Sequence, residues 1–143
     1  MRVIISACLL GVKCRYNAKS AKNPRLLKKL KGITVIPICP EQLGGLPTPR
    51  EKSHIVQGTA FEVLSGKGKV MTKSKKDITE NFIRGAKESY KIAKLTGAKI
   101  AYLKDKSPSC GVNKIYSKKG KIVKGQGVTA ALFSLKEIKV ISV

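Results

Sequence analysis

The chain contains few acidic residues, few arginines and no long apolar run. Because no apolar stretch reaches the length of a membrane-spanning helix, we expect no membrane segment. The apolar run before Cys8 is shorter than that of a signal peptide and predicts a first β-strand instead. Only five residues are arginine, and neither an arginine-rich segment nor an RNA-binding aromatic motif occurs, so no common RNA-binding module is indicated. We therefore expect a cytoplasmic protein whose thiols stay reduced.

The shortage of acidic residues leaves a large positive charge. Thirty lysine and arginine residues stand against eight aspartate and glutamate residues, a formal net charge of +22. Such a field attracts polyanions, including nucleic acid. However, the basic residues are nearly all lysines spread evenly along the chain, a pattern that a solvated surface explains at least as well. Binding of nucleic acid through the basic surface is therefore a secondary expectation.

Length and cysteine content limit the type of fold. A chain of 143 residues with 42% hydrophobic residues predicts one globular domain over residues 1–143. Its four cysteines fit a disulfide scaffold poorly, because a chain of this size and apolar content needs no such support. They form no Cys-x-x-Cys pair, which structural zinc sites commonly use, so zinc bound by all four is the weaker of the metal hypotheses.

Apolar strands alternate with helices along the chain. Strands are predicted at Val3–Ser6, Ile33–Ile38, Lys99–Lys104 and Ile138–Ser142. Helices are predicted at residues 23–31, capped by Asn23 and Pro24, at 77–96, opened by a capping box of Asp77 and Glu80 and ended by Gly97, and at 128–136. This alternation predicts a single-domain three-layer α/β sandwich with a Rossmann-like, mainly parallel sheet.

The remaining segments are expected to be hairpins and loops. Ala60–Leu64 and Lys69–Thr72 are predicted as a hairpin, and Lys114–Ser117 and Lys121–Val123 as short edge strands. The segment Cys39–Arg50 is rich in Gly and Pro and is predicted to lack regular structure.

Three predicted strands each lead into a cysteine: Cys8, Cys39 and Cys110. The carboxyl ends of parallel strands open onto one rim of the sheet, where α/β folds place their sites. Three thiolates that meet there favour a soft-metal or iron–sulfur site. Cys14 lies in a loop beyond Cys8; it either supplies a fourth thiolate or stays out of the site and leaves one metal position open.

Polar residues near these cysteines are candidates for catalysis. Glu41, two positions after Cys39, is a candidate general acid or base, with a salt bridge to Arg50 as the alternative. Ser107 and Ser109 lie close enough to Cys110 for a hydroxyl to reach the site, although both also suit a turn. Elsewhere, Gly125-x-Gly127 predicts a helix start that faces a polar or anionic ligand rather than NAD, and His54 is predicted to be a half-buried hydrogen-bonding residue.

Four segments together resemble the thiouracil desulfidase family, iron–sulfur desulfidases formerly catalogued as a domain of unknown function: Ser6–Gly11, Cys39–Arg50, Ser107–Gly111 and Gly125–Leu132. The resemblance spans nearly the whole chain. It implies a 4Fe–4S cluster held by Cys8, Cys39 and Cys110, with the fourth iron free to bind the sulfur of a substrate. It also implies catalytic roles for Glu41 and for either Ser107 or Ser109. Cys14 is not carried over as a ligand, and Asn17 stands where the family usually has an acidic residue.

The resemblance implies a cluster-dependent, non-redox desulfidase. The reaction is hydrolysis of a C=S bond in a small thiocarbonyl, such as the thiolated nucleobase 2-thiouracil, with release of hydrogen sulfide. Two alternatives remain open from the sequence: a cluster-based sulfur carrier for RNA thiolation, and a zinc-binding nucleic-acid-binding module. The sequence predicts no oligomeric state.

Overall fold

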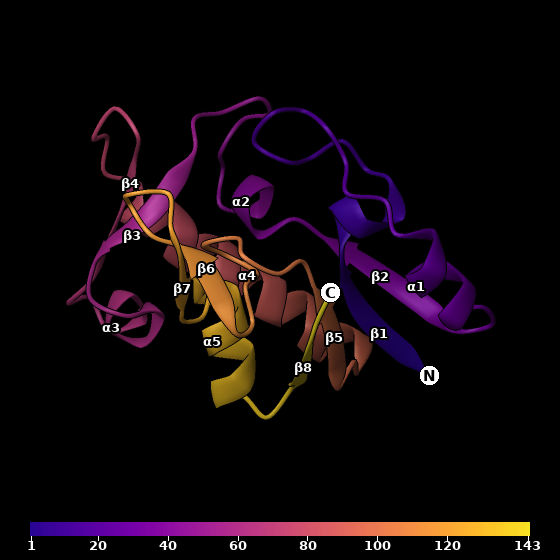
Figure 1. Cartoon of the computed structure of the whole chain (residues 1–143). Helices are drawn as coiled ribbons and strands as arrows, with labels where there is room; N and C mark the ends of the chain where they lie inside the picture. The colour runs from indigo at the N-terminus through magenta and orange to yellow at the C-terminus, as the bar shows by residue number, and fades with distance from the viewer.

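The computed structural model describes residues 1–143 as a mixed α/β fold (Figure 1). Its elements, in chain order, are β1 (Arg2–Ser6), the 3-10 helix η1 (Ala7–Leu10), α1 (Pro24–Lys29), β2 (Thr34–Ile38), α2 (Pro40–Leu43), β3 (Ser53–Gln57), α3 (Ala60–Leu64), β4 (Lys69–Thr72), α4 (Thr79–Thr96), β5 (Ile100–Leu103), β6 (Lys114–Tyr116), β7 (Ile122–Lys124), α5 (Val128–Leu135) and β8 (Lys139–Ser142). None of the helices is both long and apolar enough to cross a membrane.

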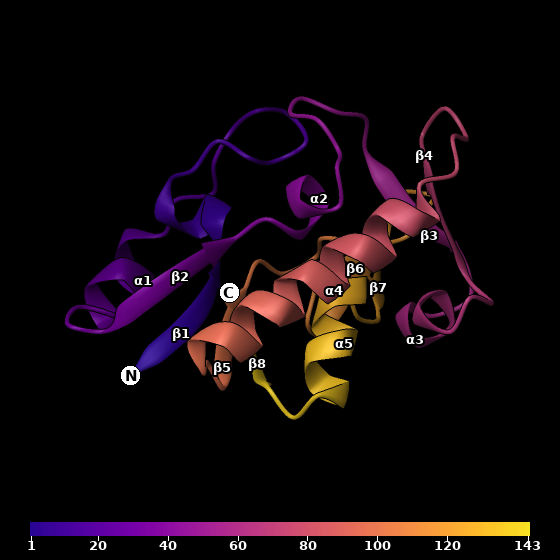
Figure 2. The ribbon, with the colours of Figure 1, turned by 180° about the vertical axis from the view of Figure 1, so that it is seen from behind.

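The central sheet has four parallel strands in the order β2-β1-β5-β8. Successive residues of β1 face opposite sides of it. Ile4 belongs to a core cluster with Ala93 of α4 and Phe133 of α5, whereas Ile5 packs with Leu26 of α1 on the other face. Helices thus cover both faces, and Figure 2 shows α4 in front of β5 and α5 when the molecule is seen from behind. The predicted parallel α/β sandwich is confirmed.

Helix ends follow local sequence, with one exception. The Asn23 side chain accepts a hydrogen bond from the Leu26 N–H at 3.0 Å, and Gly97 ends α4 in the left-handed conformation, both as predicted. The predicted capping box at the start of α4 is wrong. The Asp77 side chain accepts a hydrogen bond from the Thr79 N–H, but α4 begins at Thr79. Its N-cap residue is therefore Ile78, whose side chain makes no capping hydrogen bond.

Three further predictions outside the central sheet are wrong. Ala60–Leu64 is the helix α3, because Thr59 and Glu62 form a capping box and the apolar positions 60 and 63 pack inward. The antiparallel partner of β4 is instead β3. The β6 and β7 strands pair with each other as a separate two-stranded sheet rather than as edges of the central one. The Gly- and Pro-rich segment after Cys39 contains the short helix α2, which starts at Pro40.

Two glycines allow α2 to lie directly against α4. A Cβ atom at Gly85 would be 2.0 Å from the Pro40 carbonyl oxygen, and one at Gly44 would be 2.0 Å from the Asn81 carbonyl oxygen. The Asn81 side chain donates a hydrogen bond to the Gly44 carbonyl at 2.8 Å. The backbones therefore touch, and this contact fixes the position of α2 and of the residues at its start.

We expect Gly85→Ala to destabilise the fold and to displace α2. The added methyl group collides with backbone, which cannot move aside as a flexible side chain can. Overpacking of this kind costs about 1–3 kcal/mol or more. Urea denaturation measures the loss, and Lys87→Ala, at an exposed position of the same helix, is the control expected to change stability by less than ~0.5 kcal/mol. Equal stabilities for the two variants would contradict the backbone contact.

Candidate functional site

Three cysteines lie at the carboxyl ends of three neighbouring strands. Cys8 lies in η1 directly after β1, Cys39 immediately precedes α2 at the end of β2, and Cys110 lies in the turn after β5. Cys8 interacts electrostatically with both of the others. Cys8 and Cys110 are buried and Cys39 is half-buried. Residues about a hundred positions apart in sequence thus share one rim of the sheet (Figure 1).

Cys14 is a fourth sulfur at the same place. Its side chain lies in one buried cluster with that of Cys8, and Cys39 packs against this cluster. The Cys39 thiol also donates to the Cys14 carbonyl oxygen, with a distance of 3.7 Å between Sγ and O. The loop after η1 therefore folds back over the strand ends and brings Cys14 beside two of the candidate ligands. No three His, Cys, Asp or Glu side chains are arranged to hold a single metal ion.

The three candidate ligand thiols differ in their tendency to ionise. The hydrogen bond from Cys14 lowers the pKa of Cys8, and the nearby Lys104 ammonium acts in the same direction. The hydrogen bond to Cys14 and burial both raise the pKa of Cys39. Burial raises the pKa of Cys110 to about 12. Because metals bind thiolates, loading of a metal here displaces protons, most of all from Cys39 and Cys110.

Glu41 connects to the cysteines through a serine. Its Oε2 atom accepts a hydrogen bond from the Ser109 hydroxyl at 2.8 Å. That hydroxyl lies 3.8 Å from the Cys110 sulfur. On the other side, the Glu41 Oε1 atom accepts a bond from Arg50 Nε at 3.0 Å. The salt bridge and the contact with the cysteine site, which the sequence presents as alternatives, coexist on the two carboxylate oxygens.

The two candidate serines have different surroundings. The Ser107 oxygen accepts hydrogen bonds from the backbone N–H groups of Ser109 and Cys110 at 3.1 and 2.9 Å, a pattern typical of a turn. The Ser109 hydroxyl lies between Glu41 and Cys110, and this residue is only 3% exposed. The two hydroxyl oxygens are 3.0 Å apart. Ser107 thus shapes the turn, and Ser109 contacts the carboxylate.

Arg50 has a larger structural role than the sequence indicates. Its side chain is 7% exposed, against 12% for that of Glu41. Besides Glu41 it binds the backbone oxygens of Cys14 and Pro47, at 3.0 and 3.1 Å, and the Thr48 hydroxyl at 3.0 Å. One guanidinium therefore ties the loop of Cys14 to the segment that carries Glu41. From the sequence, the position of Arg50 at the end of the Gly- and Pro-rich segment indicates only a salt bridge to Glu41 and not its bonds to the loop of Cys14.

Comparison with known proteins places the chain in a family. The family model described as 2-thiouracil desulfurase matches residues 3–143. The chain belongs to the 2-thiouracil desulfurase family. It is 41% identical over 142 residues to the Bacillus subtilis (strain 168) protein named "Uncharacterized protein YbbK", covering 98% of this chain and 94% of that one. The family resemblance predicted from the sequence is confirmed.

A solved structure is similar over almost the whole fold. It is a [4Fe-4S]-dependent thiouracil desulfidase, TudS, with 38% sequence identity and a TM-score of 0.86. The similarity covers 99% of this chain and 89% of the TudS chain. The overall fold of the chain is thus that of TudS.

The Gly125-x-Gly127 motif of this family member supports the cysteine turn. The backbone N–H groups at the start of α5 donate to carbonyl oxygens of the turn: Val128 to Pro108 and Thr129 to Ser109, both at 2.9 Å. A Cβ atom at Gly127 would lie 2.4 Å from the Ser109 carbonyl carbon. The expectation that this helix start faces a ligand is therefore wrong. Its N–H groups bind the main chain next to Cys110 instead.

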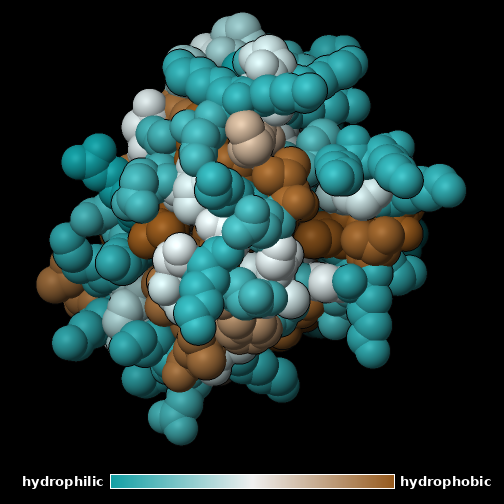
Figure 3. Space-filling model, turned by 90° about the vertical axis from the view of Figure 1, so that its left-hand side faces the viewer, coloured by the Kyte–Doolittle hydropathy of each residue, from teal (hydrophilic) through white to brown (hydrophobic).

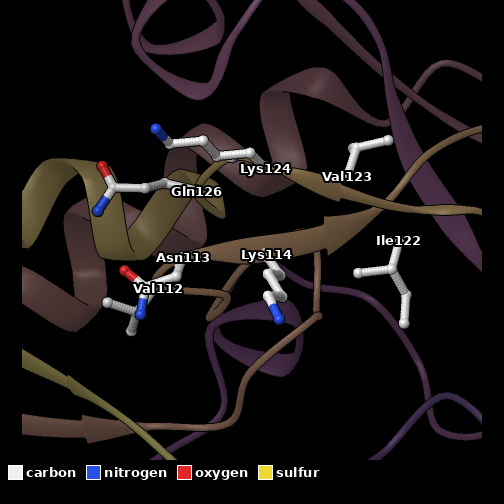
Figure 4. Close-up of a pocket in the computed structure, with 8 residues that line it drawn as sticks. Val112, Asn113, Lys114, Ile122, Val123, Lys124 and Gln126 are labelled. Atoms are coloured by element: carbon white, nitrogen blue, oxygen red, sulfur yellow. The ribbon is translucent and has the colours of Figure 1, made fainter.

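A cavity of about 790 Å³ lies beside the site rather than around the cysteines. It is lined by the β6–β7 hairpin and the residues next to it, among them Lys114, Ile122, Lys124 and Gln126 (Figure 4). Val112, two residues after Cys110, also lines it. His54, by contrast, is half-buried on β3, where burial lowers its pKa.

Proposed function

We propose that this protein is a 4Fe–4S-dependent desulfidase that acts on a thiolated nucleobase such as 2-thiouracil in the cytoplasm. The overall change is hydrolysis: the C=S group and water become C=O and hydrogen sulfide, with no net electron transfer. The observation that carries the proposal is the chain of contacts from Glu41 through Ser109 to Cys110, beside the other two strand-end cysteines.

The donor set suits an iron–sulfur cluster. Cys8, Cys39 and Cys110 supply three soft thiolates from three separate strand ends, and none is paired in a disulfide. These residues would hold three of the cluster irons. When bound, the cluster supplies a Lewis-acidic iron for the thiocarbonyl sulfur. Cys14 has no ligand role in this scheme.

The polar residues handle the proton of the attacking water. In the structure the Glu41 Oε2 atom accepts a hydrogen bond from the Ser109 hydroxyl, with 2.8 Å between the two oxygens, so Glu41 can take a proton from water directly or through Ser109. Arg50, bound to the other carboxylate oxygen, holds Glu41 directed at Ser109. Ser107 holds the turn that presents Ser109.

The proposal is tested by incubating cluster-loaded protein with 2-thiouracil under anaerobic conditions. We expect equal amounts of uracil and sulfide, in multiples of the cluster content, and none from cluster-free protein. A fully loaded protein that releases no sulfide from 2-thiouracil would contradict this substrate and favour another thiolated compound or a role in sulfur delivery.

The serine contacts give a second expected result. Ser109→Ala removes the hydroxyl between Glu41 and Cys110, so we expect a loss of turnover per cluster of roughly 100-fold, at the lower end for proton-transfer groups. Ser107→Ala removes the single oxygen that accepts hydrogen bonds from two backbone N–H groups, and we expect it to lower thermal stability while turnover per cluster falls far less. Sulfide release and thermal unfolding of both variants show which serine takes part in the reaction and which stabilises the turn. The opposite ranking in turnover would make Ser107 the reacting serine.

A second candidate function, sulfur delivery for RNA thiolation, rests on the basic surface. The β6–β7 hairpin follows the Cys110 turn directly and carries five exposed lysines: Lys114, Lys118, Lys119, Lys121 and Lys124. The face in Figure 3 is mostly hydrophilic, with separate apolar patches. Such a cluster of lysines suits phosphate groups. Measuring RNA binding against salt concentration tests it; no binding at low salt would remove this candidate.

A further inference from the structure

Cys14 is the one sulfur at the site without a role in the proposed reaction. It is 3% exposed and lies in one buried cluster with Cys8, against which Cys39 packs, and the Cys39 sulfur is 3.7 Å from the Cys14 carbonyl oxygen. A cysteine packed in one cluster with two others is more than a small apolar residue that fills a core. Its position allows a covalent bond to either neighbour without a long movement of the chain.

Contacts on both sides hold Cys14 in this position. The Arg50 guanidinium donates to the Cys14 carbonyl oxygen at 3.0 Å, and the Cys39 thiol lies 3.7 Å from the same oxygen. Further along the loop, the Ala21 N–H donates to the Cys8 carbonyl at 2.9 Å. The loop is thus tied at two points to the segments that carry the ligand cysteines.

We infer that Cys14 is an oxidative modification site, which in the cluster-free protein forms an internal disulfide with one of the two ligand cysteines it contacts, Cys8 or Cys39. The oxidant is a peroxide. It oxidises the ligand thiol to a sulfenic acid and is itself reduced to water. The Cys14 thiol then attacks that sulfur, and the sulfenic oxygen leaves as a second water. In total the two thiols lose two electrons and two protons, and the peroxide takes up these electrons and protons to form two water molecules.

The consequence rests on the proposed function, since it requires Cys8 and Cys39 to be cluster ligands. A ligand tied to Cys14 cannot bind iron, so oxidised protein loads no cluster. It is also protected from further oxidation to a sulfinic acid, which thiols do not reverse, whereas a dithiol reductant restores a disulfide by exchange. Cys14 therefore makes the loss of an oxygen-sensitive cofactor reversible.

The sequence makes the disulfide easy to map. Trypsin places each cysteine on a separate peptide: residues 3–13 for Cys8, 14–15 for Cys14, 32–50 for Cys39 and 107–114 for Cys110. Cluster-free protein is treated with hydrogen peroxide, its free thiols are alkylated, and the non-reduced digest is analysed by mass spectrometry. We expect peptide 14–15 linked to peptide 32–50 or 3–13, and the same link in Cys110→Ser. Alkylated Cys14 in the oxidised sample, or links that omit it, would overturn the inference.

Recovery of iron binding tests the protective role separately. After peroxide and then dithiothreitol, we expect wild-type protein to load iron and sulfide as fully as untreated protein, and Cys14→Ser to lose most of its loading. Equal recovery in both would overturn the protective role. Because the peptide map requires no turnover, it stands or falls independently of the desulfidase activity.

Discussion

Replacing Cys8, Cys39 or Cys110 with serine is expected to abolish stable cluster assembly, whereas Cys14→Ser is expected to retain nearly the full content. Each of the three lies at the end of a different strand, so the loss of one leaves only two thiolates from the rigid sheet. A serine hydroxyl is a poor substitute, because iron–sulfur clusters select thiolate ligands. Iron and acid-labile sulfide per chain, after anaerobic reconstitution in the presence of a reductant, measure the outcome.

The Cys14 variant is the informative control for this set. Cys14 lies in the same buried cluster as Cys8, with Cys39 packed against it, and it differs from them in lying on a loop instead of a strand end. If Cys14→Ser lost iron as completely as the other three variants, all four cysteines would be ligands. The open iron position that the proposed reaction requires would then not exist.

Glu41→Gln is expected to keep the cluster and to lose most of the turnover. The amide has nearly the same size but cannot take a proton from Ser109 or water. General acid–base groups contribute ~100- to 10,000-fold to rate, which corresponds to about 3–5 kcal/mol at ~1.4 kcal/mol per tenfold. Sulfide released from 2-thiouracil per cluster is the measurement.

Two effects have to be separated in this variant. The Glu41–Arg50 pair is largely buried, so its disruption also lowers stability and leaves the guanidinium without a charged partner. Normalising turnover to cluster content removes the contribution of misfolded protein. Glu88→Gln, which disrupts an exposed pair with Lys91, is the matched control and should leave turnover unchanged. Equal rates for wild type and Glu41→Gln would remove Glu41 from the mechanism.

The strand ends could be predicted from sequence because their signals are local. Buried parallel strands appear as short apolar runs, and the parallel arrangement alone brings Cys8, Cys39 and Cys110 to one rim. Helix ends at Asn23 and Gly97 were equally local, since a cap acts within a few residues. The segment at 60–64 was predicted wrongly because a run of five residues with four apolar side chains suits a short strand as well as one helical turn.

The hydrogen bonds within the site depend on tertiary contacts that cannot be predicted from local sequence. The return of Cys14 to the cysteines depends on the path of a loop, which backbone bonds such as Ala21 to Cys8 determine. The position of Glu41 depends on the contact of Gly85 with α2, and Arg50 reaches two loops at once. The distinction between Ser107 and Ser109 likewise required the geometry of the turn.

The central claim is that three strand-end cysteines hold a 4Fe–4S cluster. The metal and acid-labile sulfide content of protein purified anaerobically tests it most directly, because it requires no substrate. The account predicts about four iron and four sulfide per chain, as for other such clusters, and no zinc. A colourless protein that contains zinc and no iron would contradict it.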